Sequence, residues 1–379
     1  MIKSTISAIN KYIKETDWML LLCCISLSSF STLLIYSLYI NGEIGRLSTV
    51  LVQPAMMICG TAAAIVLSKI DYHVMARMWK WHSLVSYGLI FLLFPFGIQR
   101  VEWVDDKVWL PIPFTGLTFQ PSELLKISFI ITFAYHLSNV KGKINNIKQL
   151  MLLCLHGAFP VLLIHLQGDD GTALVMAVIF ISMLFTAGLS WKYILPVAAM
   201  IPPAAVVAWK FFLDDDKKNR ILAIINPELV SEAVSWQQQR GLIAIGNGGI
   251  WGNGIFMETG QFRYVPEVYN DSIFTYIGES VGFIGCIAVL AALAFLCIRI
   301  LCNGLRAEDS TGKYICVGIF AMMGIQIIMN VGMCLGMMPV IGVTLPFLSA
   351  GGTSTGTLYL GIGVVLSVYL HSGKDMLFG

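Results

Sequence analysis

Residues 18–40 read WMLLLCCISLSSFSTLLIYSLYI and contain no charged side chain. A run of about twenty apolar residues can cross the hydrocarbon core of a bilayer as a helix. This run is too long for the apolar core of a cleaved signal peptide, and no small-residue cleavage site follows it. We therefore expect residues 18–40 to form a retained first membrane-spanning helix.

The composition of the whole chain is that of a membrane protein. Of its 379 residues, 57% are hydrophobic and 12% are charged, whereas about 25% of the residues in a typical soluble domain are charged. The mean hydropathy is +0.77. A formal net charge of +2 gives no general attraction to nucleic acid, so we expect no nucleic-acid partner. The nine cysteines include no CxxC pair, which argues against a disulfide framework.

Similar apolar runs recur along the chain and predict an all-α, polytopic membrane protein with ten transmembrane helices. Most Lys and Arg residues of the short connections fall on the side that contains both termini, so the positive-inside rule places both termini in the cytoplasm. With no repeat and no soluble domain visible, residues 1–379 are expected to form one integral membrane domain. The expected spans are residues 18–40, 50–68, 82–99, 119–138, 149–166, 171–189, 191–212, 272–300, 314–337 and 350–371.

The long segment 213–271 between the seventh and eighth expected helices should be extracytoplasmic, because long loops cross regardless of their charge. It contains the nearly apolar, glycine-punctuated stretch GLIAIGNGGIWGNGIF at residues 241–256, which does not have the composition of a disordered linker. We expect this stretch to be partly helical or re-entrant and to be shielded from lipid by other parts of the protein.

Charged and polar residues inside or beside a membrane span are costly, so each such cluster is a candidate site. Glu123 and Lys126 lie three residues apart and share a helix face, where they form either a functional pair or a structural ion pair. Asp169 and Asp170 follow His165 at the outer mouth of a span. Two carboxylates there can cap a helix or hold a divalent cation.

Two further clusters lie at the outer face. Asp271 stands at the water–hydrocarbon boundary beside Ile273 and Phe274, an apolar setting that raises a carboxylate's pKa and suits a general base. An N-cap of the eighth helix is the alternative. Residues 338–354 are rich in Pro and Gly and indicate irregular backbone at a cavity, with N–H donors available to a phosphate. Small-residue helix packing is the competing interpretation.

Taken in order, these motifs resemble the family of shape, elongation, division and sporulation (SEDS) proteins, which includes RodA, FtsW and SpoVE. The matching motifs occur in the same order and are spread along most of the chain. They are Gln120-Pro-Ser-Glu123 with Lys126, Gln167 to Thr172, Ala244-Ile-Gly-Asn-Gly-Gly249, Pro339-x-x-Gly-x-x-Leu-Pro-Phe347 and Gly351-Gly-x-Ser354.

The resemblance implies a peptidoglycan glycosyltransferase that polymerises lipid II, the undecaprenyl-diphosphate-linked disaccharide pentapeptide, on the outer face of the cytoplasmic membrane. The family's essential aspartate falls on Asp271, within Pro266-Glu267-Val-Tyr-Asn-Asp271-Ser-Ile-Phe274. Glu279 falls on a glutamate of the family's next segment. A class B penicillin-binding transpeptidase is the partner that the resemblance implies.

With that family in view, Asp271 is expected to deprotonate the acceptor sugar in an inverting transfer. The leaving diphosphate requires neutralisation, by basic side chains alone or with a divalent cation, Mg or Mn, near Asp169. The candidate substrate-binding residues are Glu123, Lys126, Arg220, Arg240, Arg263, Glu279, Ser349, Gly351, Gly352 and Ser354. A lipid II flippase and a non-catalytic scaffold for the transpeptidase are the rival functions.

Overall fold

The computed structural model describes residues 14–99, 107–113, 117–211, 213–226, 230, 232–256 and 265–372, with the backbone alone at 232–235. These residues are mostly helical, and their one sheet is a two-stranded antiparallel hairpin of β1 (Leu110–Pro111) and β2 (Thr118–Phe119). The helices are α2 (Trp18–Ile40), α3 (Leu47–Ser68), α4 (Tyr72–Arg77), α5 (Trp79–Phe96), α6 (Pro121–Asn139), α7 (Ile147–His165), α8 (Asp170–Thr186), α9 (Trp191–Phe211), α10 (Asp215–Ile225), α11 (Glu232–Gly248), α12 (Ile273–Leu305), α13 (Ser310–Cys334) and α14 (Gly352–His371).

A helix occupies each of the ten segments that were expected to span the membrane. In the described part of the chain, seven helices are long and apolar enough to cross a bilayer: α2, α3, α7, α9, α12, α13 and α14. α8 is apolar but has 17 residues. The all-α class with several potential membrane spans is therefore confirmed, whereas the count of ten crossings stays a prediction.

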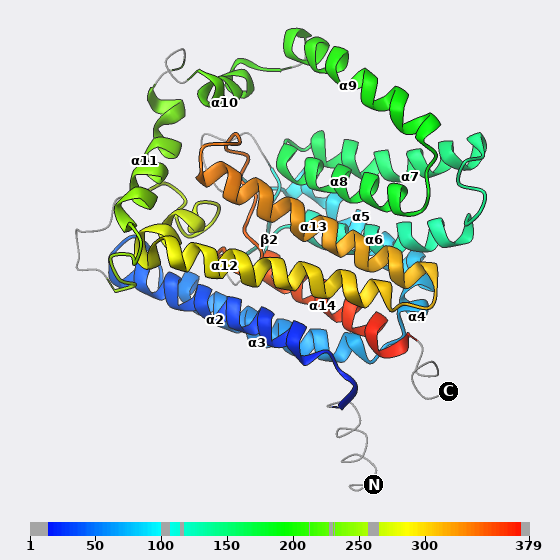
Figure 1. Ribbon diagram of the computed structural model, residues 1–379, viewed down its shortest axis with the longest axis horizontal. Coiled ribbons are helices and arrows are strands. Elements are labelled where there is room, and N and C mark those ends of the chain that lie inside the picture. Colours follow the sequence, from blue (N-terminus) through cyan, green and yellow to red (C-terminus); the bar gives the residue numbers. More distant parts are fainter. Residues whose placement is uncertain are drawn as a thin grey trace, which may run out of the picture.

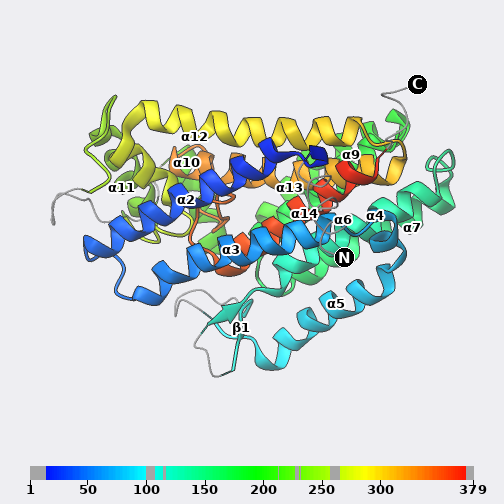
Figure 2. The same cartoon turned by 90° about the horizontal axis from the view of Figure 1, so that it is seen from below.

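The bundle has one continuous apolar core that extends from α2 to α14. Figures 1 and 2 show α12 and α5 on opposite sides of this bundle, with α13, α14 and α6 between them. α14 packs closely along α3 because small residues line the contact. A Cβ on Gly60 would lie 2.7 Å from the ring of Tyr359, and one on Gly363 would lie 2.8 Å from the Cα of Ala64.

α12 is broken near its first third at Gly282, where φ is +68° and ψ is −168°. The break frees backbone groups that bond to the stretch after α11. Gly249 and Ile250 accept from the N–H groups of Phe283 and Ile284 at 2.9 and 3.2 Å. In the opposite direction, the N–H groups of residues 253 and 254 donate to the carbonyls of residues 279 and 280 at 3.0 and 2.9 Å. The glycine-rich stretch thus supplies hydrogen-bond partners for the backbone groups that the break in α12 leaves unpaired within the helix.

We expect Gly282→Ala to be strongly destabilising. The positive φ alone costs about 1–2 kcal/mol for an L-residue, and a Cβ there would lie 2.3 Å from the backbone N of Gly252. The matched control is Gly324→Ala in α13, where a Cβ meets nothing within 4 Å. Thermal unfolding of the purified proteins in detergent should show a lower midpoint for the first variant and an unchanged or higher one for the second. Equal midpoints would contradict the close approach at Gly282.

The helices α9, α10 and α11 form an arch at one side of the bundle (Figure 1). None of the residues of α9 is buried. α11 returns to the body and packs against α12, with Ala244 fully buried. Residues 241–248 of the glycine-rich stretch are thus helical, as expected. Protein covers one face of this helix only, because Leu242 and Ile243 are 44% and 45% exposed and Trp251 beyond it is 79% exposed, so the expected shielding is met only in part. The position of the stretch at a membrane surface stays a prediction.

Candidate active site

Four helices begin at the same end of the bundle, which we call the site end. α6 begins at Pro121, α8 at Asp170, α12 at Ile273 and α14 at Gly352. Bonds between their first turns or preceding loops join them: the side-chain amide of Gln120 donates to Asp169 at 3.1 Å, and the N–H of Ala350 donates to the carbonyl of Tyr269 at 2.7 Å. Helix N-termini carry partial positive charge, so an anion is favoured close to the first turn of each of these helices.

Asp271 lies at the site end in a turn that precedes α12. The N-cap of α12 is Ser272, so the N-cap alternative for Asp271 is wrong. The residue is partly buried, and Oδ1 has no hydrogen-bond partner among the described residues. Burial, followed by the negative charge of Glu267, raises the pKa of Asp271 to about 7. A carboxylate with this pKa can accept a proton near neutral pH and release it afterwards.

The loop between α13 and α14, residues 335–351, forms the opposite wall of the site. A Cβ on Gly342 would lie 3.9 Å from Oδ2 of Asp271, so the loop passes directly by the carboxylate. The same loop approaches α8 closely, because a Cβ on Gly171 would lie 2.8 Å from the carbonyl oxygen of Ile341. The α13–α14 loop therefore connects Asp271 with the start of α8.

Glu123 and Lys126 form a buried ion pair, with 2.7 Å between Nζ and Oε1 and side-chain exposures of 7% and 2%. Thr357 of α14 donates to Oε2 of Glu123 at 3.3 Å. Asp169 is close enough for the charges of this pair to act on its carboxylate, although burial is the main cause that raises its pKa. These contacts bring together the first two predicted clusters, QPSE and QGDDGT.

Asp169 caps α8: its Oδ1 accepts from the N–H of Thr172 at 2.9 Å, and its Oδ2 accepts from Gln120. Among the described residues, no group of three His, Cys, Asp or Glu side chains could hold a metal ion. Both oxygens of Asp169 are already engaged, so these residues do not by themselves fit a resident divalent cation. A cation near Asp169 stays a prediction.

The predicted basic residues occupy different positions around the site end. Arg220 of α10 is exposed and donates to the carbonyl of Val340 at 3.3 Å, which places it beside the α13–α14 loop. Arg240 of α11 lies over the ring of Trp236, with 5.4 Å between its Cζ and the ring centroid. Arg263 lies outside the described residues. Of the predicted cations that the structure describes, Arg220 is the one placed in the open at the wall of the site.

The serines and glycines at the start of α14 serve mainly to hold the backbone. Ser349 Oγ accepts from the N–H of Leu345 at 2.7 Å, and Ser354 shares a hydrogen bond with Thr344 at 3.1 Å. A Cβ on Gly352 would lie 2.7 Å from Val52 of α3, which favours the packing interpretation for this glycine. Gly351 is the N-cap of α14. Their binding of a phosphate stays a prediction.

Glu279 is 1% exposed and lies on the first segment of α12, before the break. The N–H of Asn253 donates to its carbonyl at 3.0 Å, which places the residue against the glycine-rich stretch. A substrate-binding role for Glu279 stays a prediction.

Three features of the site were missed from the sequence. The first is Lys217 of α10, which pairs with Asp170 at 2.8 Å and adds a cation to the predicted cluster, where His165 lies 2.5 Å from the other oxygen of Asp170. Asn330, a buried amide of α13, bonds to the backbone at Asp271. Its position inside an apolar span was a signal that could have identified it. Lys217 and Asp170 are too far apart in the sequence for any local pattern to pair them.

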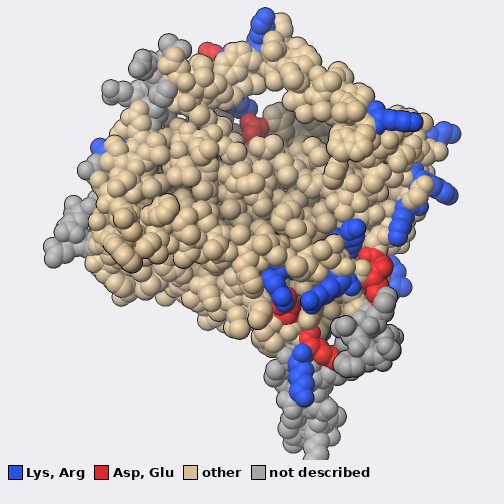
Figure 3. All heavy atoms as spheres, in the orientation of Figure 1, with Lys and Arg blue, Asp and Glu red and all other residues tan. Residues whose placement is uncertain are grey.

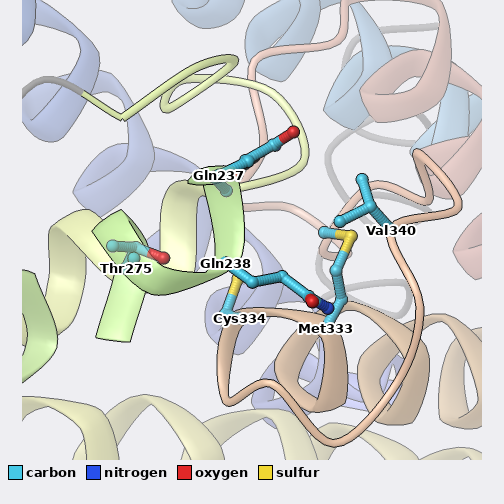
Figure 4. A pocket seen from close by; sticks show the side chains of 8 residues that line it. Gln237, Gln238, Thr275, Met333, Cys334 and Val340 are labelled. Carbon is cyan, nitrogen blue, oxygen red and sulfur yellow. Dashed lines mark hydrogen bonds between the residues drawn. The ribbon is translucent and has the colours of Figure 1, made fainter. Parts of the chain in front are cut away.

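The third missed feature is a cavity of ≈ 10 Å³, room for one water molecule, whose lining includes Ser272, the residue after Asp271 (Figure 4). Gln237 and Gln238 of α11 line it from one side, and Met333 and Cys334 of α13 line it from another. The side chain of Gln237 donates to Ser272 Oγ at 3.1 Å, and that of Gln238 donates to the carbonyl of Met338 at 2.8 Å. These amides join α11 to both walls of the site.

Comparison with known proteins decides the family. Residues 17–374 match the family described as cell cycle protein, which comprises FtsW, RodA and SpoVE. The chain belongs to this family. A probable peptidoglycan glycosyltransferase FtsW from Geobacter metallireducens is 31% identical over 94% of this chain and 96% of its own length. The peptidoglycan glycosyltransferase MrdB of Escherichia coli K12 is 28% identical over the same shares.

Solved structures resemble the chain as well. One chain of a peptidoglycan synthase complex superimposes with a TM-score of 0.78, at 23% identity, covering 95% of this chain and 99% of its own. The rod shape determining protein RodA of Thermus thermophilus gives a TM-score of 0.69, at 22% identity, covering 95% and 98%. At these identities the likeness concerns the fold, which agrees with the arrangement described above.

Proposed function

We propose that this chain is a peptidoglycan glycosyltransferase that polymerises lipid II, with Asp271 as the general base. Membership in the FtsW/RodA/SpoVE family supports the activity. The observation that carries the residue assignment is a carboxylate with a pKa of about 7 at an end of the bundle where four helix N-termini meet. Base and anion site are then side by side, as transfer from a diphosphate requires.

The reaction is one inverting displacement. Asp271 accepts the proton of the acceptor sugar's 4-hydroxyl while that oxygen bonds to the anomeric carbon of the donor. The bond from this carbon to the diphosphate oxygen breaks, and the α-linked donor becomes a β-linked glycan. The N-terminal ends of the four helices stabilise the charge that develops on the diphosphate.

Arg220 is the best-placed partner for the leaving diphosphate. It is exposed, and it bonds to the α13–α14 loop two residues before Gly342, the glycine that faces Asp271. Arg240 is the second candidate, held over Trp236 on the neighbouring α11. Lys126 is a less direct one, because its ammonium already neutralises Glu123 inside the bundle.

The arch supplies room for the isoprenoid chain of the substrate. An apolar hollow of ≈ 410 Å³ follows one face of α9, lined by Met200, Pro203, Ala204, Val207 and Ala208. Figure 3 shows an opening between the arch and the body, with acidic atoms visible inside it. An apolar face on the arch beside this opening suits a lipid whose headgroup reacts at the membrane surface.

The proposal extends to the setting of the enzyme. Both termini would be cytoplasmic, with the site end outside the cell, as the distribution of Lys and Arg indicates. A class B penicillin-binding transpeptidase would be the partner, and the likeness to a chain from a peptidoglycan synthase complex supports this.

The test is polymerisation of labelled lipid II by the purified protein, with and without candidate transpeptidases, as a function of pH. Because Asp271 must be ionised to accept a proton, the rate constant kcat should rise with pH through the pKa of about 7. Electrophoresis of the labelled glycan gives the rate. If no glycan strands form with any partner, the proposed activity is contradicted. If strands form at a rate independent of pH between about pH 5 and 8, the role of Asp271 as general base is contradicted.

A further inference from the structure

Asn330 stands at the junction of the two walls of the site. It lies in the last quarter of α13 and is fully buried. Its side-chain Nδ2 donates to the carbonyl of Asp271 at 2.7 Å and to the carbonyl of Val343 at 2.8 Å. One amide group thus bonds to the turn that carries the catalytic carboxylate and to the loop that faces it.

The orientation of this amide is determined by its surroundings. Both acceptors are carbonyl oxygens, so only the NH₂ end of the side chain can face them. Oδ1 of Asn330 is buried without a partner among the described residues. Leaving a buried acceptor unpaired costs about 1–3 kcal/mol. The residue therefore contributes its two N–H groups, and its oxygen contributes no bond.

We propose that Asn330 is a positioning residue that sets the width of the slot between Asp271 and the α13–α14 loop. The two N–H bonds of a planar amide diverge by about 120°, which holds the two carbonyl oxygens about 5 Å apart. Gly342, next to Val343, faces Oδ2 of Asp271 across this slot. The acceptor hydroxyl must enter between them to reach the carboxylate.

Other contacts near Asn330 also hold the turn that carries Asp271 against α13. Cys334, one turn further along α13, lies with its Sγ 3.8 Å from the same carbonyl of Asp271. The titratable group that acts on the carboxylate is Glu267 in the turn, and the charge of Asp271 acts in turn on the thiol of Cys334 on α13. Without Asn330, two backbone carbonyls lose their donor, and the turn can move away from α13 toward water. Asp271 would then be less buried.

The test compares Asn330→Leu, which keeps the number and branching of the side-chain heavy atoms, with Gln326→Leu. Gln326 lies one turn earlier on α13, is 1% exposed and also has a buried, unpaired oxygen, so the pair is matched for burial and helix. Displacing a catalytic group by about 1 Å costs roughly 10²-fold. We expect kcat of Asn330→Leu to fall by about that factor with little change in KM for lipid II, and that of Gln326→Leu to stay near wild type.

The pH profile separates positioning from a general loss of structure. Because a less buried Asp271 has a lower pKa, the acidic limb of the kcat profile should move to lower pH in Asn330→Leu and stay in place in Gln326→Leu. If Asn330→Leu does not fold, Asn330→Gln retains the amide but shifts it by one methylene, and the same movement of the limb is expected.

The inference rests on the proposed function, and the outcomes keep the two apart. Failure of wild type and Gln326→Leu to make glycan would refute the function itself. If those two proteins polymerise and the Asn330 variants show wild-type kcat, or a loss in proportion to unfolded protein with an unmoved limb, the positioning role is overturned while the function stands.

Discussion

Asp271→Asn should abolish glycan polymerisation and leave the protein folded. A general base contributes typically about 10²–10⁴-fold to the rate, and an amide of the same shape cannot accept the proton. The measurement is the initial rate of strand formation from labelled lipid II, per folded molecule. Asp215→Asn is the matched control, since Asp215 of α10 has a 94% exposed side chain and lies in the same expected extracytoplasmic region. Its rate should equal that of wild type.

Stability should not explain the loss in Asp271→Asn. Burial raises the pKa of Asp271 to about 7, above that of an aspartate in an unfolded chain, so its ionisation opposes folding increasingly as the pH rises toward 7. Asparagine does not ionise, and the thermal midpoint at neutral pH should be equal or higher. A flippase or a scaffold needs no base; strands made at the wild-type rate by Asp271→Asn would remove this residue from the mechanism.

Lys126→Met should be severely destabilising. The substitution removes the ammonium 2.7 Å from Glu123 and leaves that carboxylate buried near Asp169. Removing one partner of a buried ion pair typically costs about 3–5 kcal/mol. Denaturation of the purified protein in detergent measures the loss. The comparison is Lys217→Met, whose side chain is 44% exposed in its pair with Asp170 and should cost at most about 1 kcal/mol.

The double variant Glu123→Gln with Lys126→Met distinguishes a structural pair from a functional one. Replacing both partners removes the buried charges, so most of the lost stability should return. Because Lys126 is 2% exposed, we expect turnover per folded molecule to return as well. A stable double variant that polymerises slowly would instead place Lys126 at the leaving diphosphate.

The sequence was sufficient for the class of fold and for the order of the helices. In lipid the backbone N–H and C=O groups of a long apolar run can form hydrogen bonds only with one another, so such a run becomes a helix. The helix of residues 18–40 and the start of the next segment after Asp271 were therefore predictable to within a few residues. The choice of Asp271 came from a motif, because Asp271 and Asp169 look equally functional from composition alone.

What joins these motifs was decided by tertiary structure. The buried pair of Glu123 and Lys126 was open to two interpretations until its exposure was known, and Asp271 was an N-cap candidate until Ser272 took that place. The break at Gly282 and the bond from Asn330 to Asp271 link segments distant in the chain. Hydropathy is a local property and specifies which segments become helices; proximity between their ends, and hence a carboxylate's pKa, depends on how those helices pack.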